Sequence, residues 1–247
     1  MPVSDLTLHD VTSSQPGREC SGFMRLIAHR GLSRSAPENT LAAFASALSV
    51  GFHGIETDVR LSSEGELILY HDRISRLGLP VAAMTRAELS QSEGYLVPTL
   101  TEALDAFPDA LWNIELKAAA AAVPLMALLK QMSGRRQVIV TSLRHELMPV
   151  AAETLQFECG LIVWHRPIAL NSLLYAAMPH QRLRILVWHY EAMDLTLLQQ
   201  ANALGFRNYI FGAQNQHEHA MCAELGMHGV ITDYPEFVGL DCAPSLQ

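Results

Sequence analysis

Short apolar segments of strand-like composition alternate along the chain with longer segments that fit helices. Many of the short segments are apolar throughout, a pattern typical of parallel strands that are covered on both faces. The pattern predicts nine strands, at Arg25–His29, Gly54–Val59, Glu66–His71, Leu111–Leu116, Gln137–Thr141, Phe157–Val163, Arg184–Trp188, Phe206–Phe211 and Gly229–Thr232.

Helix signals lie between most of these strands. Asn39 or Thr40 can cap a helix whose apolar residues follow directly, and we expect this helix to end before Gly51. Thr99 and Glu102 have the spacing of a capping box at the start of another helix. The alternation of strands and helices predicts an α/β fold with a parallel sheet, either open or closed into a barrel.

The second and third predicted strands do not fit a regular barrel. Nine strand candidates compete for the eight places that a (β/α)8 barrel offers. The link from Val59 to Glu66 is too short for a crossover helix, so the chain either crosses back in extended form or makes a hairpin. The pattern leaves both routes open.

One domain accounts for most of the chain. The 247 residues contain no internal repeat, no low-complexity tract and no linker, and this length suits a single α/β barrel. We therefore predict one domain at residues 25–247. Residues 1–24 are polar and precede the first predicted strand, so we expect them to form a flexible N-terminal extension.

Composition excludes several classes of protein. With 49% hydrophobic and 17% charged residues, the chain is too apolar to be disordered. The net charge of −8 argues against general nucleic-acid binding, which needs a basic surface. The longest apolar run, Ala118 to Leu129, is shorter than the ~20 residues that span a bilayer, so no stable membrane insertion is expected. The scattered cysteines indicate reduced thiols and a cytoplasmic protein.

Acidic residues lie near the carboxyl ends of two predicted strands, where ligands bind in parallel α/β folds. Glu56 and Asp58 are two positions apart, which places both carboxylates on one face of a strand, and Glu115 and Lys117 repeat this spacing. Such acids repel each other unless they are protonated or bridged by a cation, and carboxylates favour Mg²⁺ or Ca²⁺. The alternative is a structural ion pair with Arg30 or Lys117.

Two histidines and two cations complete the candidate site. His29 and His71 lie at the ends of predicted strands and can exchange protons near neutral pH. Arg30 and Lys117 suit phosphate oxygens, or balance the acids instead. The sequence contains no GxxxxGK[ST], GxGxxG or GxSxG motif, which removes support for nucleotide-binding and serine-hydrolase functions.

An ordered set of motifs resembles the glycerophosphodiester phosphodiesterase family. The motifs extend in order over nearly the whole chain, from about Arg25 to Val238. They are Ile27–Gly31, Ala36–Thr40, Gly54–Val59, Tyr70–Asp72, Asn113–Lys117 and Gly229–Pro235.

The resemblance implies a TIM-type (β/α)8 barrel and metal-dependent hydrolysis of small glycerophosphodiesters to sn-glycerol 3-phosphate and an alcohol. The roles that it implies are Glu56, Asp58 and Glu115 as ligands of one divalent ion, His29 and His71 as the acid–base pair, Arg30 and Lys117 as phosphate-binding residues, and Glu38 and Asn39 as support for the substrate-binding first loop.

The sequence departs from the family in two places near the substrate. Phe211–Asn215 stands where the family often has a Trp-Thr-Val-Asn run, and Arg73–Leu77 stands where a Leu-x-Arg-Thr run is common. Since the tryptophan is missing, we predict that Trp188 leans into the barrel mouth and covers the glycerol or head-group end of the substrate. A cation–π contact with a quaternary ammonium head group is then possible. Packing within the barrel is the alternative role for both Trp188 and Trp164.

Other functions on the same barrel remain open. A lysophospholipase D would keep the catalytic residues but need an apolar groove for an acyl chain, and a phospholipase-C-like lyase is a more distant alternative. A non-catalytic binding protein would be expected to have lost one of the three acids or two histidines, and all five are present.

Overall fold

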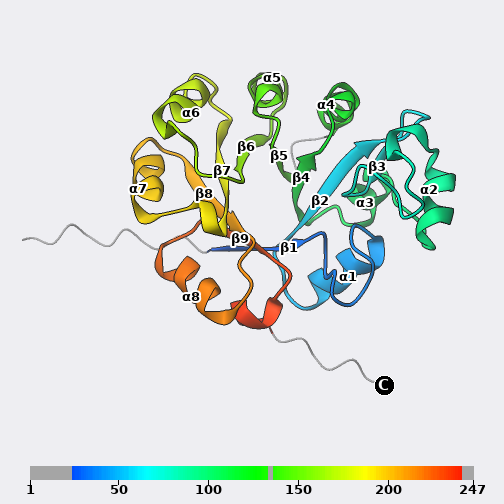
Figure 1. Ribbon diagram of the computed structural model, residues 1–247, viewed down its shortest axis with the longest axis horizontal. Helices are drawn as coiled ribbons and strands as arrows, with labels where there is room; N and C mark the ends of the chain where they lie inside the picture. Colours follow the sequence, from blue (N-terminus) through cyan, green and yellow to red (C-terminus); the bar gives the residue numbers. More distant parts are fainter. Residues whose placement is uncertain (1–23, 133–135, 241–247) are drawn as a thin grey trace, which may run out of the picture.

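Eight parallel strands form a closed barrel in the computed structural model, which describes residues 24–132 and 136–240 (Figure 1). Around the barrel each strand pairs with the next in chain order, and the last pairs with the first. The strands are β1 Arg25–His29, β2 Gly54–Leu61, β4 Leu111–Leu116, β5 Gln137–Ser142, β6 Glu158–Val163, β7 Leu183–His189, β8 Arg207–Phe211 and β9 Gly229–Thr232. The predicted TIM-type barrel is confirmed. The N-terminal extension stays a prediction, because residues 1–23 lie outside the described residues.

The third of the nine predicted strands, β3 (Leu67–Leu69), is not part of the barrel ring. It pairs antiparallel with β2, with Val59 opposite Leu69, so the short link makes a hairpin. The strand is shorter than predicted, but the backbone N–H of Tyr70 still donates to the carbonyl of Asp58 at 3.0 Å. The hairpin therefore returns the chain to the level of the β2 carboxylates and leaves His71 beside them.

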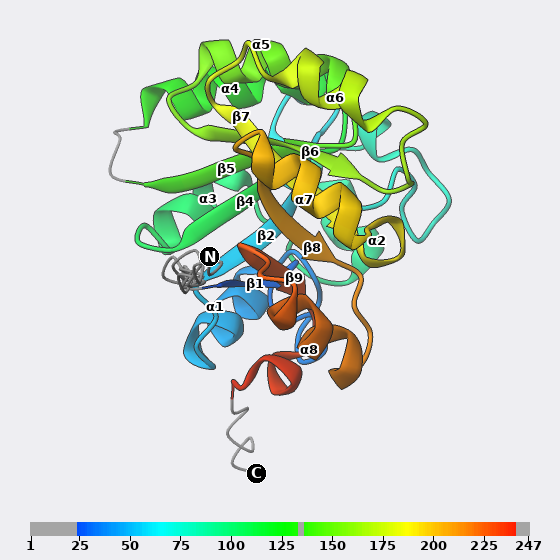
Figure 2. The same cartoon turned by 90° about the vertical axis from the view of Figure 1, so that its left-hand side faces the viewer.

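The helices lie outside the barrel in both views (Figures 1 and 2). Thr40 caps the first one by accepting from the N–H of Ala43, and Thr99 and Glu102 form the expected capping box. The α-helices are α1 Leu41–Ser49, α2 Arg86–Glu93, α3 Leu100–Ala106, α4 Ala122–Gln131, α5 Met148–Thr154, α6 Leu170–Ala177, α7 Leu195–Ala203 and α8 Gln216–Glu224, and the 3-10 turns are η1 Val81–Ala83, η2 Ala119–Ala121, η3 His145–Leu147, η4 Tyr190–Ala192 and η5 Pro235–Val238. Within the described ranges, no helix has the length and apolar character needed to cross a membrane.

Two apolar layers hold the barrel together. A small cluster fills its interior, including Ile27, Ile139, Val187 and Ile231, while a larger one packs the outer face of the strands against the helices. Because successive strand residues point to opposite faces, residues next to the interior positions belong to the outer layer. The charged residues Glu56, Asp58 and Glu115 lie toward the carboxyl ends of β2 and β4, above this apolar interior.

Candidate active site

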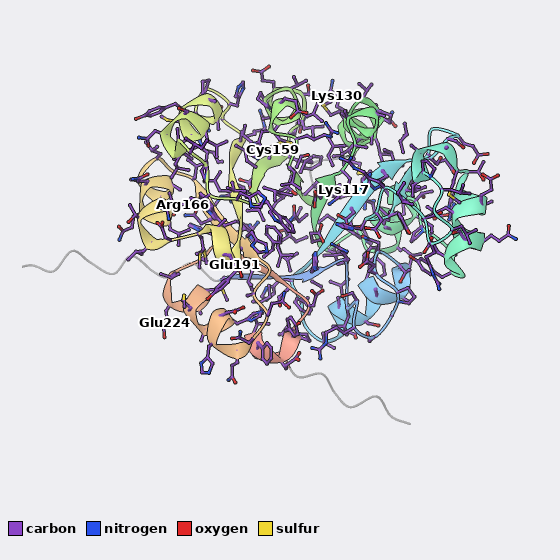
Figure 3. The ribbon with its side chains drawn as sticks, viewed as in Figure 1. Lys117, Lys130, Cys159, Arg166, Glu191 and Glu224 are labelled. Atoms are coloured by element: carbon purple, nitrogen blue, oxygen red, sulfur yellow. The ribbon has the colours of Figure 1, made fainter. Side chains whose placement is uncertain are left out.

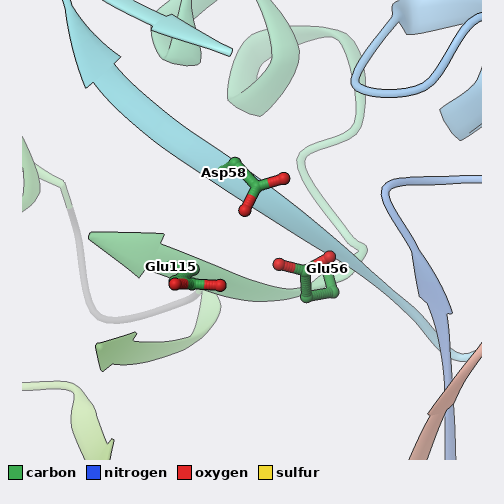
Figure 4. Close-up of side chains that lie close together, drawn as sticks. All are labelled: Glu56, Asp58 and Glu115. Carbon is green, nitrogen blue, oxygen red and sulfur yellow. The ribbon is translucent and has the colours of Figure 1, made fainter. Parts of the chain in front are cut away.

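Three carboxylates converge at the mouth of the barrel (Figure 4). Glu56 and Asp58 lie on β2, and Asp58 is in register with Glu115 on the neighbouring strand β4. One oxygen of each carboxylate lies within 4.8 Å of one from each of the others. Glu56 and Asp58 are 4% and 1% exposed, so both carboxylates are largely removed from bulk water.

Two cations partly balance these acids. The Lys117 Nζ lies 2.9 Å from Glu115 and 3.4 Å from Asp58. Figure 3 labels Lys117, directly after β4, closer to the barrel than Lys130 on the outer helix α4. The Arg30 Nε lies 3.3 Å from Asp58, and the Arg30 backbone N–H donates to Glu56 at 3.1 Å. Both cations thus form the ion pairs that were the structural alternative, but three carboxylates still face two cations.

The excess of carboxylates over cations shifts the pKa values of the acids. Burial, and then the nearby Asp58, raise the pKa of Glu56 to about 8. Burial and Asp58 also raise the pKa of Glu115. Burial opposes ionisation of Asp58 too, but Lys117 and Arg30 outweigh it and lower its pKa. The cluster as it stands does not readily hold three negative charges, and a divalent cation would remove that penalty. Carboxylate oxygens at this spacing are the hard donors that Mg²⁺ and Ca²⁺ take.

Asn39 and Glu38 lie behind the site. The Asn39 amide donates to Asp58 at 2.9 Å, and its oxygen accepts from the backbone N–H of Asp58 and the hydroxyl of Thr57. Glu38 accepts two hydrogen bonds from Arg30 Nη1, at 2.9 and 3.0 Å. Asn39 is 2% exposed, and neither residue lines the pocket. They hold Asp58 and Arg30 from behind the pocket wall, and a direct contact of Glu38 or Asn39 with substrate stays a prediction.

Each candidate histidine has a carboxylate at its Nδ1. His29 Nδ1 lies 3.1 Å from Asp233, which also accepts from the Ser33 hydroxyl at 2.8 Å. His71 Nδ1 lies 2.7 Å from Asp72. Such pairs fix the ring and leave Nε2 for another partner. Burial lowers the pKa of His29, but Asp233 and Glu56 raise it above its ordinary value.

The pKa of His71 is shifted in the opposite direction, below its ordinary value. Burial lowers its pKa, with Arg30 and Lys117 adding to the effect and Asp58 opposing it. The two rings therefore differ in proton affinity, as a pair that works as acid and base requires.

The opposite wall of the pocket is aromatic. Trp164, at the end of β6, stacks on His189 with ring centroids 4.8 Å apart, and Phe211 packs against both. Gly212 permits this arrangement, because a Cβ at its position would lie 2.8 Å from the His189 ring. We call Trp164, His189 and Phe211 the aromatic wall.

The prediction for Trp188 is wrong. Its side chain is fully buried in the outer apolar layer, and its indole N–H donates to Asn208 at 2.8 Å. Its neighbours Val187 and His189 line the pocket instead, because alternate residues of β7 face inward. Trp164, 47% exposed, is the tryptophan at the mouth.

The structure brings most of the predicted residues into one pocket. Its wall includes His29, Arg30, Glu56, His71, Glu115 and Lys117. Asp58 lies directly behind them, within reach of both other carboxylates. The sequence analysis missed Asp233, Trp164 and His189 as site residues. Their position at or just after the ends of strands was the available signal.

Comparison with known proteins gives a consistent result. Residues 29–237 match the model of the glycerophosphoryl diester phosphodiesterase family. A glycerophosphodiester phosphodiesterase of Caldanaerobacter subterraneus subsp. tengcongensis is 28% identical over 240 residues, covering 85% of this chain and 94% of the relative. A glycerophosphodiester phosphodiesterase structure from Thermotoga maritima superposes with a TM-score of 0.77 at 24% identity, covering 89% of this chain and 99% of the other.

A third match carries a ligand. The Oleispira antarctica phosphodiesterase in complex with sn-glycerol-3-phosphate has a TM-score of 0.75 and 26% identity, covering 85% of this chain and 93% of that one. With the family model spanning nearly all of the barrel, this chain belongs to the glycerophosphoryl diester phosphodiesterase family of phosphoric diester hydrolases.

Proposed function

We propose that this enzyme hydrolyses glycerophosphodiesters to sn-glycerol 3-phosphate and an alcohol at a divalent metal ion. The observation that most supports this proposal is that two carboxylates, two cations and two carboxylate-backed histidines line one pocket, with a third carboxylate directly behind its wall. The sn-glycerol-3-phosphate bound by the Oleispira antarctica relative supports the product.

Glu56, Asp58 and Glu115 would hold the ion, Mg²⁺ or Ca²⁺. When bound, such an ion polarises phosphate oxygens and offsets the charge that develops in the transition state. Arg30 and Lys117 contribute further positive charge at the same wall. Asn39 keeps the Asp58 carboxylate in place, since its two hydrogen bonds to that residue fix both side chain and backbone.

His29 and His71 move the protons. One takes a proton from the nucleophile, and the other protonates the leaving alcohol. Attack by water gives glycerol 3-phosphate directly, whereas attack by the neighbouring glycerol hydroxyl gives a cyclic phosphate, which water must then open. Asp233 and Asp72 hold the two rings by Nδ1, so that Nε2 of each ring is the atom that exchanges the proton. Trp164 and its aromatic wall cover the uncharged glycerol half of the substrate.

The test is release of glycerol 3-phosphate from a panel of glycerophosphodiesters, with EDTA treatment followed by addition of Mg²⁺ or Ca²⁺. We expect turnover that EDTA abolishes and metal restores. Turnover that persists in metal-free protein would contradict the metal, and no turnover of any diester by the metal-loaded protein would contradict the activity.

A lysophospholipase D is the second candidate, favoured by the exposed apolar residues beside the pocket. Trp164 is 47% exposed and Leu143 45%, and both line the mouth. An acyl chain on the glycerol half could lie along them. Preference for lysophosphatidylcholine over glycerophosphocholine, lost in Trp164→Ala, would support this candidate.

We further propose a cytoplasmic location. The two cysteines within the described residues, Cys159 and Cys222, are buried and free, as is usual for proteins of reducing compartments.

A further inference from the structure

A second cleft adjoins the catalytic pocket. The two share His71, Glu115, Lys117 and Leu143, so they are continuous at the barrel mouth. The cleft extends from there between the segment after β3 and the segment after β5, where Arg73 and Arg144 line it. Its place, next to a catalytic histidine, makes it accessible to one half of a bound diester.

The cleft is positively charged, although the whole chain carries a net charge of −8. Arg60, Arg73, Arg144 and Lys117 line it, against the carboxylates of Asp72 and Glu115 only. These two carboxylates are already engaged, because Glu115 binds Lys117 at 2.9 Å and Asp72 binds His71 at 2.7 Å. The three arginines thus have no acidic partner inside the cleft.

The outer two arginines are available to a ligand. Arg73 is exposed, and among the described residues its guanidinium makes no hydrogen bond or ion pair. Within the described part of the chain, the only side-chain partner of the Arg144 guanidinium is Glu146, in an exposed ion pair at 3.4 Å, and such pairs contribute little. Like charges gathered in a concave place repel each other, and an anion removes that repulsion.

The third arginine connects the cleft to the catalytic residues. Arg60 is 9% exposed, and its Nε and Nη2 donate to the backbone carbonyl of His71 at 2.9 and 2.5 Å. A guanidinium has five N–H donors, so donors remain for a ligand after this contact. The base of the cleft is therefore fixed directly beside His71.

We infer that this arginine cleft binds a second phosphate group, carried by the alcohol half of the glycerophosphodiester. Guanidinium groups bind phosphate oxygens in pairs of hydrogen bonds, and the cleft offers three of them. The aromatic wall on the other side takes the uncharged glycerol half. The inference rests on the proposed function, of which it names the preferred substrate class.

The test compares two substrates that differ only in this group: glycerophosphoglycerol and its derivative phosphorylated on the leaving glycerol. Wild-type enzyme should show the higher kcat/KM for the phosphorylated compound. Arg73→Gln and Arg144→Gln should each reduce that preference by about two- to fivefold, since exposed charge pairs contribute on this scale, and the double variant by about tenfold or more. Turnover of glycerophosphoglycerol itself should stay within about twofold of wild type.

The matched control is Arg182→Gln. Arg182 is exposed directly before β7, at the opposite end of the barrel, and its loss changes net charge equally. The control should keep the wild-type preference. No preference in wild type, or an unchanged preference in the double variant, would overturn the inference.

A binding measurement separates failure of the inference from failure of the proposed function. If neither compound is hydrolysed, the proposed function fails, and calorimetric titration of the His29→Ala protein with both compounds still tests the cleft. The inference is supported if the phosphorylated compound binds more tightly than the unphosphorylated one and if Arg73→Gln combined with Arg144→Gln weakens that binding. Equal binding of both compounds contradicts it.

Discussion

The two sides of the barrel mouth are built on different principles. On the side of β1, β2 and β4, ionisable residues occupy buried or half-buried positions, and hydrogen bonds hold them: Asn39 binds Asp58, and Asp233 binds His29. On β6, β7 and β8, the wall consists of stacked rings with no ion pair between them. A buried charge needs partners at defined distances, whereas apolar contact tolerates several residues of similar size. This difference fits the proposal that the first side performs the chemistry and the second contributes substrate binding.

Glu56→Gln should have the largest effect on activity. It removes a proposed metal ligand, so we expect a loss of at least about a thousandfold in glycerol 3-phosphate release, more than removal of an outer-shell partner costs. Because burial and Asp58 raise the pKa of Glu56 to about 8, the neutral amide should not destabilise the fold. Thermal unfolding checks this point. Near-wild-type turnover would remove Glu56 from the site.

His29→Ala and His71→Ala should come next. General acid–base catalysis contributes ~10²–10⁴-fold, so each variant should lose kcat on that scale, with a smaller change in KM. The pH–rate profile of the wild-type enzyme should be bell-shaped. A histidine whose removal costs less than about tenfold has no such role.

Asp233→Asn should lower kcat by about ten- to a hundredfold, because loss of the carboxylate that orients a functional histidine typically costs this much. The hydrogen bond and charge of Asp233 raise the pKa of His29. Without them that pKa falls, so the limb of the pH–rate profile that reports His29 should move to lower pH. The direction is the same whether His29 is the acid or the base. An unshifted profile would show that Asp233 does not tune His29.

Trp164→Ala should affect binding more than chemistry. Loss of the apolar cover over the glycerol half should raise KM by about fourfold or more for every glycerophosphodiester, since about 0.8 kcal/mol is lost for each CH₂ uncovered. The kcat value should stay within a fewfold. A fall in kcat as large as that of His29→Ala would break the division between the two sides.

Trp188→Phe should have the smallest effect on kinetics. Its side chain is fully buried on the outer face of β7 and its indole N–H is hydrogen-bonded to Asn208. The substitution should therefore lower the free energy of unfolding by about 1–3 kcal/mol and leave kcat and KM unchanged. Denaturant unfolding measures the free energy of unfolding, and the diester assay measures kcat and KM. A change in KM without a loss of stability would place Trp188 in the pocket after all.

The sequence predicts one side of the mouth better than the other, for a physical reason. Period-two spacing of charged residues, as in Glu56 and Asp58, shows which face of a strand carries the candidate site. In β7 both faces are apolar, so the same period cannot tell the inner residue Val187 from the outer residue Trp188. The sequence likewise left two connections open between β2 and β3, a hairpin or an extended crossover. A short link alone does not decide whether the next strand is antiparallel or parallel. Contacts between distant segments, such as His29 with Asp233, depend on barrel closure.

Metal binding tests the central claim most directly. Metal-stripped wild-type protein should be titrated with Mg²⁺ or Ca²⁺ by calorimetry, and glycerol 3-phosphate release followed over the same titration, with Glu56→Gln as the paired variant. The account predicts one divalent ion per chain in wild type, activity that rises with its occupancy, and loss of both in Glu56→Gln. Full activity before any ion binds, or equal binding by Glu56→Gln, would contradict it.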